Sequence, residues 1–265
     1  MHPGSQQTNN SARVAILGLG GTIAMKPAGR GAVPGLTAED LVAQLPESVV
    51  GHIRHVENFR QLPGAHIGLD DLVQLAARIR ELEQSGEANG FVVVQGTDTI
   101  EETVFALELL CRGSAPVVVT GAMRHAGLVG PDGAANIANS VVLAATPAAR
   151  ERGAMVCFND EIHAGWAVQK TAATNLAAFS SPGFGPVGHV IEGRTELMLT
   201  PVRWPAVADE TAAVKPAPVA IIAAALGEGP ELLDAVGQGN WRGLVVQALG
   251  AGHLPASWVE PLERL

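Results

Sequence analysis

The sequence predicts an α/β protein built on a parallel sheet, and three observations carry that prediction. Short apolar runs rich in β-branched residues occur at residues 14–17, 91–94 and 116–119. Between them lie segments with helical spacing of apolar residues, the clearest at residues 69–82. Glycine and threonine follow the ends of the strand-like runs. Strands that alternate with helices in this way form parallel sheets with right-handed crossovers.

Each expected element follows from a local signal. A short helix opens after Thr37, a preferred N-cap residue, and a strand is expected at residues 53–59. An alanine-rich helix at residues 134–145 precedes a strand at residues 154–158. Beyond residue 180 the pattern breaks into glycines, prolines and short extended pieces.

The chain therefore divides into three predicted regions. Residues 12–190 form a catalytic α/β domain, residues 191–217 a proline-rich linker, and residues 218–265 a second α/β domain. Two strands and two helices are few for an independent core, so the second domain is expected to be partial or dependent on a partner.

Composition narrows the class of function. The chain has 265 residues, 47% of them hydrophobic and 16% charged, as in a folded soluble protein. A net charge of −9 argues against nucleic acid as a partner, and no apolar run reaches the roughly 18 residues of a membrane span. The polar start of the chain resembles no secretory signal, and Cys111 and Cys157 sit in apolar surroundings. We expect a cytoplasmic protein.

The stretch that organises the chain is QGTDTIEET, at residues 95–103. It places Thr97, Asp98 and Thr99 between a strand and the start of a helix, where open α/β sheets bind ligands. A structural alternative is a capping box, with Thr99 as N-cap and Glu102 three residues later. Such a cap would leave Thr97 and Asp98 without a role.

A second glycine turn, GLGGTIA at residues 18–24, follows the first strand and carries Thr22. A dinucleotide fingerprint would need a third glycine where Ile23 stands, so nucleotide binding is disfavoured. The glycine- and proline-rich segment 26–35 contains Arg30 and is interpreted as a loop over the strand ends, a candidate lid.

Threonine hydroxyls are weak nucleophiles and need an adjacent base. Lys170, oriented by a carboxylate, can supply one, so Thr97, Asp98 and Lys170 are a candidate proton-relay set with Thr22 as the hydroxyl that meets the substrate. The alternative for a lone lysine is a solvated surface charge. The cluster DEIH at residues 160–163 lacks a second histidine pair, so we interpret it as a polar strand and turn and expect no metal.

Three motifs together resemble the signatures of the L-asparaginase/glutaminase amidohydrolase family, to which bacterial L-asparaginases belong. They are GGTIA at residues 20–24, GTDTIEET at residues 96–103 and TGAMR at residues 120–124. They stand in the family's order at family-like spacing, and the resemblance continues through residues 132–133, 159–160 and 170–171.

The resemblance implies a flavodoxin-like N-terminal domain, a smaller C-terminal α/β domain, and hydrolysis of L-asparagine to L-aspartate and ammonia without metal or organic cofactor. Thr22 matches the family's nucleophile. Thr97, Lys170 and Asp98 match the residues that activate the nucleophile or water, and Asp98 also matches the residue that holds the substrate's α-amino group. The backbone at Thr97 and Ala122 matches contacts to the amide being cleaved. The family's habit implies a homodimer or homotetramer.

The sequence also departs from the family. The lid tyrosine has no counterpart near Gly31, since the chain contains no tyrosine. The serine and glutamine that bind the substrate carboxylate match Gly64 and Ala65. We expect the backbone N–H groups of residues 64–66 to bind that carboxylate instead, with help from Arg30.

Two alternatives stay open. The chain could be a glutaminase or an amidotransferase subunit of the same family, although no basic surface suggests tRNA binding. It could also be a catalytically weak amino-acid binder, given the lost side-chain contacts and the partial second domain.

Overall fold

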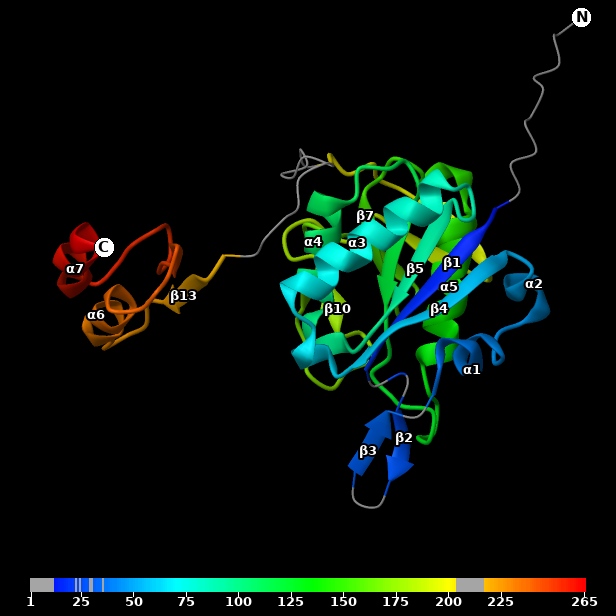
Figure 1. Ribbon diagram of the computed structural model, residues 1–265, viewed down its shortest axis with the longest axis horizontal. Helices are drawn as coiled ribbons and strands as arrows, with labels where there is room; N and C mark the ends of the chain where they lie inside the picture. The colour runs from blue at the N-terminus through cyan, green and yellow to red at the C-terminus, as the bar shows by residue number, and fades with distance from the viewer. Residues whose placement is uncertain (1–11, 22, 24, 29–30, 35, 204–216) are drawn as a thin grey trace, which may run out of the picture. The chain divides into compact units, whose positions relative to one another are not determined.

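The computed structural model describes residues 12–21, 23, 25–28, 31–34, 36–203 and 217–265, and no side chain from residue 24 to residue 35. Its internal contacts divide the chain into two compact units, Met1–Ala212 and Ala213–Leu265 (Figure 1).

The first unit contains, in chain order, β1 (Val14–Gly20), β2 (Met25–Ala28), β3 (Gly31–Pro34), α1 (Ala38–Val42), α2 (Glu47–Val50), β4 (Ile53–Leu62), η2 (Gly64–His66), α3 (Leu69–Gln84), β5 (Gly90–Val94), η3 (Thr97–Thr99), α4 (Ile100–Leu110), β6 (Val117–Thr120), α5 (Gly133–Ala145), η4 (Pro147–Ala149), β7 (Ala154–Phe158), β8 (Glu161–Ala164), β9 (Gln169–Lys170), β10 (Phe179–Ser180), β11 (Gly188–Ile191) and β12 (Arg194–Leu197). The second contains β13 (Val219–Ala223), α6 (Glu231–Gly237), β14 (Gly243–Gln247), η5 (Ala256–Trp258) and α7 (Val259–Arg264).

Among the described residues, the main sheet of the first unit has eight strands in the order β12-β11-β8-β7-β6-β5-β1-β4. Strands β4, β1, β5, β6 and β7 are parallel, whereas β8, β11 and β12 extend the sheet with antiparallel pairing. Taken in chain order, the parallel strands follow the 2-1-3-4-5 order of flavodoxin-like folds. The predicted α/β class is confirmed. The direction of winding changes between β1 and β5, the point at which such folds bind ligands.

Helices cover both faces of this sheet, and alternate residues of each strand serve one face or the other. Leu17 and Val93 belong to the core with α3 and α4, whereas Ile16 and Val92 belong to the core with α1, α2 and α5. Figure 1 shows α3 across the near side of the main sheet. Burial on both faces explains why these strands read as continuous apolar runs in the sequence.

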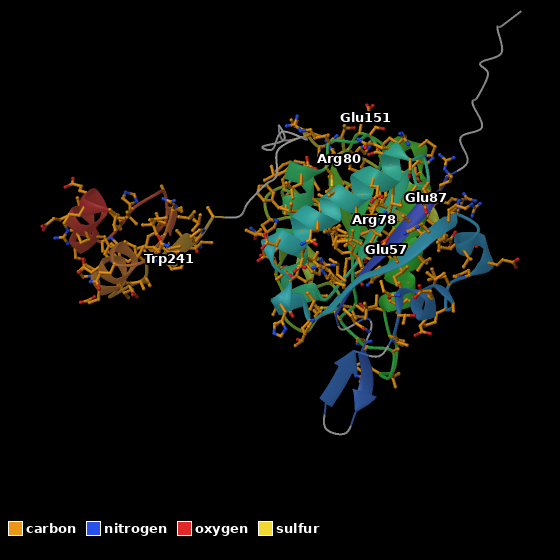
Figure 2. The ribbon with its side chains drawn as sticks, viewed as in Figure 1. Glu57, Arg78, Arg80, Glu87, Glu151 and Trp241 are labelled. Carbon is orange, nitrogen blue, oxygen red and sulfur yellow. The ribbon has the colours of Figure 1, made fainter. Side chains whose placement is uncertain are left out.

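The edge strand β4 is held against α3 by charged side chains. Glu57 accepts a hydrogen bond from Arg78 Nε at 2.9 Å (Figure 2). It also accepts one from His55 Nε2 at 2.9 Å, and His55 Nδ1 lies 2.7 Å from Glu87. Burial opposes ionisation of Glu57, but the hydrogen bonds from His55 and Arg78 outweigh it and lower the pKa of the carboxyl.

Several local predictions are confirmed. Thr37 caps α1 through a capping box with Asp40, and the predicted helix at residues 69–82 is α3. Cys111 and Cys157 are free thiols, and burial raises the pKa of both to about 12. Cys157 is buried, as expected of an inert core cysteine, whereas Cys111 is partly buried and packs against the core that contains α3 and α4.

The interpretation of residues 26–35 as a loop is wrong in part, because β2 and β3 pair antiparallel within it. Gly31 begins β3 opposite Ala28. Arg30, the other predicted lid residue, lies outside the described residues.

The main sheet also continues beyond residue 190. Strand β12 pairs with β11 along four residue pairs, within the region we expected to be linker. The sequence predicted only short extended pieces beyond residue 180, and antiparallel edge strands tolerate such short, partly polar segments.

The second unit is small. Strands β13 and β14 are parallel, and α6 and α7 cover one face of the pair with a core of Ile222, Ala224, Leu233 and Trp258. The indole N–H of Trp258 donates to the Gly229 carbonyl at 2.8 Å, which satisfies the polar atom of this fully buried side chain. Across the part of the chain that the structure describes, no helix is long and apolar enough to cross a membrane.

Candidate active site

Two glycine turns meet where the sheet changes direction. Gly21 follows β1 with a φ of +87°, and a Cβ built on it would lie 2.0 Å from the backbone nitrogen of Gly96, which follows β5. A side chain at position 21 is therefore excluded by both sterics and backbone conformation. This contact brings the chain leading into Thr22 against the turn leading into Thr97.

Thr22 itself lies outside the described residues. Its neighbours Gly21 and Ile23 are buried, and Ile23 packs with Val94 and Ala122 in one core cluster. The flanking residues thus lie against the ends of β5 and β6.

Thr97, Lys170 and Asp98 come together at the end of β5. Lys170 Nζ donates to Thr97 Oγ1 at 2.8 Å and lies 3.7 Å from Asp98 Oδ1. The Thr97 residue is 6% exposed, whereas the Asp98 side chain is 60% exposed. The surface-charge alternative for Lys170 is wrong, because its side chain is only 20% exposed and is bonded to Thr97.

The capping-box alternative for Thr99 and Glu102 is also wrong. Thr99 occupies the N-cap position of α4, but its side chain makes no capping hydrogen bond. Its hydroxyl donates instead to the Gly64 carbonyl at 2.9 Å, and Gln95 Nε2 approaches Thr99 Oγ1 at 3.3 Å. Thr99 thus ties the turn at residues 63–66 to the turn that carries Thr97.

Gly64 lies beside the exposed carboxylate. A Cβ on Gly64 would be 3.2 Å from Asp98 Oδ2 and 3.2 Å from the Gly96 carbonyl oxygen. The absence of a side chain there leaves room at Asp98 Oδ2. Ala65 is exposed, but the backbone N–H of His66 donates to the Pro63 carbonyl at 2.9 Å, so the expectation that this N–H binds a substrate carboxylate is wrong.

The third motif closes the same region from β6. A Cβ on Gly121 would be 2.4 Å from the Gln95 carbonyl oxygen and 3.5 Å from Thr97 Cγ2, so the two turns touch. Ala122, which is 1% exposed, follows directly. Ala122 therefore directly follows Gly121, the residue whose backbone lies close to Thr97.

Two polar side chains at the start of α5 hold the β6 turn, and sequence reasoning assigned them no role. Asp132 accepts hydrogen bonds from the backbone N–H groups of Met123 at 3.0 Å and Arg124 at 2.8 Å. Asn136 Nδ2 donates to the Gly121 carbonyl at 3.0 Å. The Asp132-Gly133 pair at the start of the helix was the available signal for this function.

The DEIH cluster forms a turn followed by strand β8. Asp160 has a φ of +66° in a turn, and His163 is 1% exposed in β8. His163 Nδ1 lies 3.0 Å from Ser181 Oγ, and Nε2 lies 3.2 Å from Glu161 Oε2. Burial lowers the pKa of His163, and Glu161 opposes that shift.

The fold and these residues define the class of protein: a flavodoxin-like α/β enzyme with a hydroxyl, an amine and a carboxylate gathered at the switch point of its sheet. The family model described as "Asparaginase, N-terminal" matches residues 13–203. The chain belongs to the asparaginase family and is an amidohydrolase, which confirms the resemblance of the three motifs.

Proteins of similar sequence and structure are named as asparaginases or glutaminase-asparaginases. The chain is 33% identical to a glutaminase-asparaginase of Pseudomonas fluorescens biotype A, over 96% of this chain and 72% of that protein. It is also 33% identical to an L-asparaginase of Bacillus licheniformis, over 95% of this chain and 78% of that protein. A crystal structure of a probable cytoplasmic L-asparaginase from Campylobacter jejuni is similar, with a TM-score of 0.87 and 29% identity, over 96% of this chain and 79% of that one.

Proposed function

We propose that this protein hydrolyses the side-chain amide of L-asparagine to L-aspartate and ammonia, with Thr22 as nucleophile. The observation that carries the proposal is the hydrogen bond of 2.8 Å between Lys170 Nζ and Thr97 Oγ1, beside Asp98 and next to the turn that leads into Thr22. Hydroxyl nucleophiles need such a proton-transfer partner within hydrogen-bond reach.

The reaction has two halves. The Thr22 oxygen bonds to the side-chain carbonyl carbon, the carbon–nitrogen bond breaks, and ammonia leaves with the hydroxyl proton. Water then attacks the resulting ester, its oxygen stays in the new carboxylate, and a proton returns to the Thr22 oxygen. Thr97 and Lys170 relay protons in these steps, because their hydrogen bond provides a direct path between hydroxyl and amine.

Asp98 is proposed to hold the substrate's α-amino group. Its carboxylate is mostly exposed, with Oδ1 toward Lys170 and Oδ2 toward Gly64, so it can accept from an ammonium that arrives from solvent. The backbone at Thr97 and Ala122 is proposed to contact the amide in reaction, supported by the buried position of both residues at adjoining strand ends.

Four further assignments are proposals of the same kind. Gly64 and Ala65 line the carboxylate end of the substrate, and the segment with Arg30 and Gly31 acts as a lid. The protein forms a homodimer or homotetramer whose only other partner is a small amino-acid amide. It works in the cytoplasm, as the Campylobacter jejuni protein is described, although a Haemophilus influenzae relative is named a probable periplasmic L-asparaginase.

L-Glutamine is a second candidate substrate, because two Pseudomonas relatives are named glutaminase-asparaginase. The two amides differ by one methylene, which a pocket distinguishes by only about 1–3 kcal/mol. The ratio of kcat/KM for the two amides is therefore the measurement that ranks them.

The test is ammonia release from L-asparagine, L-glutamine and D-asparagine by the wild type and by Thr22→Val, Thr97→Val and Thr200→Val. We expect the first two variants to lose at least about a thousandfold in kcat, since members of a catalytic set are needed together. Thr200 is exposed and serves as the matched control. Binding of aspartate or asparagine by calorimetry without any turnover would instead favour a non-catalytic binder, and full activity of Thr22→Val would exclude Thr22 as nucleophile.

A further inference from the structure

Lys170 stands on a small element outside the main sheet. Strand β9 has two residues and pairs with β10 in a separate two-stranded sheet, with Lys170 opposite Phe179. Thr97 and Asp98, by contrast, follow directly from β5 in the centre of the main sheet. The distance between Lys170 Nζ and Thr97 Oγ1 therefore depends on how β9 is held against the rest of the unit.

One carboxylate connects the two elements. Glu101, in the first turn of α4, accepts a hydrogen bond from the backbone N–H of Lys170, with Oε2 at 2.5 Å from the nitrogen. The next N–H along the strand, that of Thr171, donates to the Ala178 carbonyl at 2.8 Å. Consecutive N–H groups thus point to opposite sides, one to the β10 side of the hairpin and one to α4.

The position of Glu101 in the chain gives this hydrogen bond its significance. Helix α4 begins one residue after the η3 turn that carries Thr97 and Asp98. Glu101 therefore belongs to the same continuous segment as the two residues that Lys170 Nζ approaches. A charge-assisted hydrogen bond to the main chain fixes where the long lysine side chain starts, and so limits where its amine can reach.

We infer that Glu101 is a positioning residue: its carboxylate holds the backbone of Lys170 so that the lysine amine meets Thr97. The inference rests on the proposed function, because it concerns the same proton relay. Glu101 acts through Lys170, and its hydrogen bond is made to the main chain and not to the amine.

The neighbouring Glu102 provides a matched control. Both glutamates lie in the first turn of α4, so both interact favourably with the helix dipole. Glu102 is exposed, whereas Glu101 is partly buried against Lys170. A difference between variants at the two positions therefore reports the contact with Lys170 and not the stability of the helix.

The experiment is steady-state hydrolysis of L-asparagine by the full chain and its variants Glu101→Ala, Glu101→Gln, Glu102→Ala and Lys170→Met. We expect Glu101→Ala to lower kcat about 10- to 100-fold with KM changed less than about threefold, because misplacement of a reacting group by about 1 Å costs a factor of this size. Glu101→Gln keeps an acceptor oxygen and should recover most of kcat. Glu102→Ala should stay within about twofold of wild type.

The outcomes separate this inference from the proposed function. If Lys170→Met keeps its activity, the proposed relay fails. If Lys170→Met is inactive while Glu101→Ala keeps wild-type kcat, only the positioning role of Glu101 is overturned. Should Glu101→Ala fail to fold, Glu101→Asp retains the charge in α4 but shortens the reach, and an unchanged kcat in that variant would overturn the role equally.

Discussion

The same supersecondary unit, a strand followed by a helix and a parallel strand, occurs in both units of the protein with different surroundings. All five residues of β5 are buried, because helices cover both faces of the main sheet. Strand β13 alternates exposed and buried residues, and Ile221 is 74% exposed. In the first unit, side chains therefore pack against both faces of the strands, whereas in the second unit they pack against one face.

The difference extends to the segment after each strand. After β5 the chain enters a turn in which glycine backbones touch and Thr97 is nearly buried. After β13 it runs through Ala224 and Ala225 to Leu226, whose side chain is fully exposed. Catalytic groups need positions held to within a fraction of an ångström. In this protein, the candidate catalytic residues Thr97 and Asp98 follow a strand that is packed on both faces, and such packing holds side chains in fixed positions.

The largest expected effect comes from glycines of similar conformation in the two units. Gly21 and Gly227 have φ values of +87° and +83°, but only Gly21 has backbone atoms where a Cβ would lie. We expect Gly21→Ala to cost about 4 kcal/mol or more of unfolding free energy, since strain and overpacking add. Gly227→Ala should cost about 1 kcal/mol.

Urea unfolding of both variants, followed by circular dichroism, measures these costs, and ammonia release reports the site. A Gly21→Ala protein with wild-type stability and activity would show that the β1 and β5 turns do not meet as closely as the structure has them.

The sequence predicted most of the interior of the first unit for local reasons. Runs such as residues 91–94 and the periodicity of residues 69–82 are set by short-range pattern, and both elements formed there. The expected meeting of the turns that lead into Thr22 and Thr97 followed from parallel topology, which places strand ends at one edge. Lys170 was predicted from its chemistry alone, because it lies on β9, outside the main sheet.

Other features could not be read from the sequence, because they depend on distant partners. The capping box of Thr99 and Glu102 is absent since the Thr99 hydroxyl bonds to Gly64, 35 residues away. The hydrogen bond from the backbone of Lys170 to Glu101 leaves no signature, because every residue except proline offers the same N–H.

The second-largest expected difference in unfolding free energy is between substitutions of two isoleucines, one in each unit. Ile16 in β1 is 1% exposed, whereas Ile221 in β13 is 74% exposed. We expect Ile16→Ala to cost about 2–5 kcal/mol, through lost burial and a residual cavity, and Ile221→Ala to cost less than about 0.5 kcal/mol. Hydrogen exchange of the β1 and β13 amides measures each unit separately. A large cost for Ile221→Ala would mean that the open face of β13 is covered in solution.

A smaller effect is expected from two histidines. His163 is buried with Glu161 and Ser181 beside it and His189 nearby, whereas His253 is exposed. Burial lowers the pKa of His163, so the unfolded chain binds a proton more readily than the folded protein. The stability contributed by neutral His163 is present above an unfolded pKa of 6.5 and is lost as pH falls toward the folded value.

Unfolding free energies measured between about pH 5 and pH 7 test this sign. His163→Gln should flatten this loss of stability relative to wild type, because the substituted side chain takes up no proton in the unfolded chain. A wild-type protein that is equally stable across this range would contradict the effect of burial on His163.

The smallest expected difference separates two arginine–aspartate pairs. Asp71 accepts from Arg60 Nε at 2.8 Å and from the backbone N–H of Gly68 at 3.1 Å, so the pKa of its carboxyl is lowered. Asp234 lies 3.3 Å from Arg264, with both side chains more than half exposed. We expect Asp71→Asn to lower the unfolding free energy by about 1 kcal/mol at pH 7 and Asp234→Asn to change it almost not at all, because exposed pairs are screened by water.

The effect of Asp71→Asn should be present above about pH 4 and vanish as pH falls through the folded pKa of Asp71. Urea titrations at a series of pH values would measure this change. Equal costs for the two substitutions would show that the lower exposure of the Arg60–Asp71 pair adds nothing to its contribution to stability.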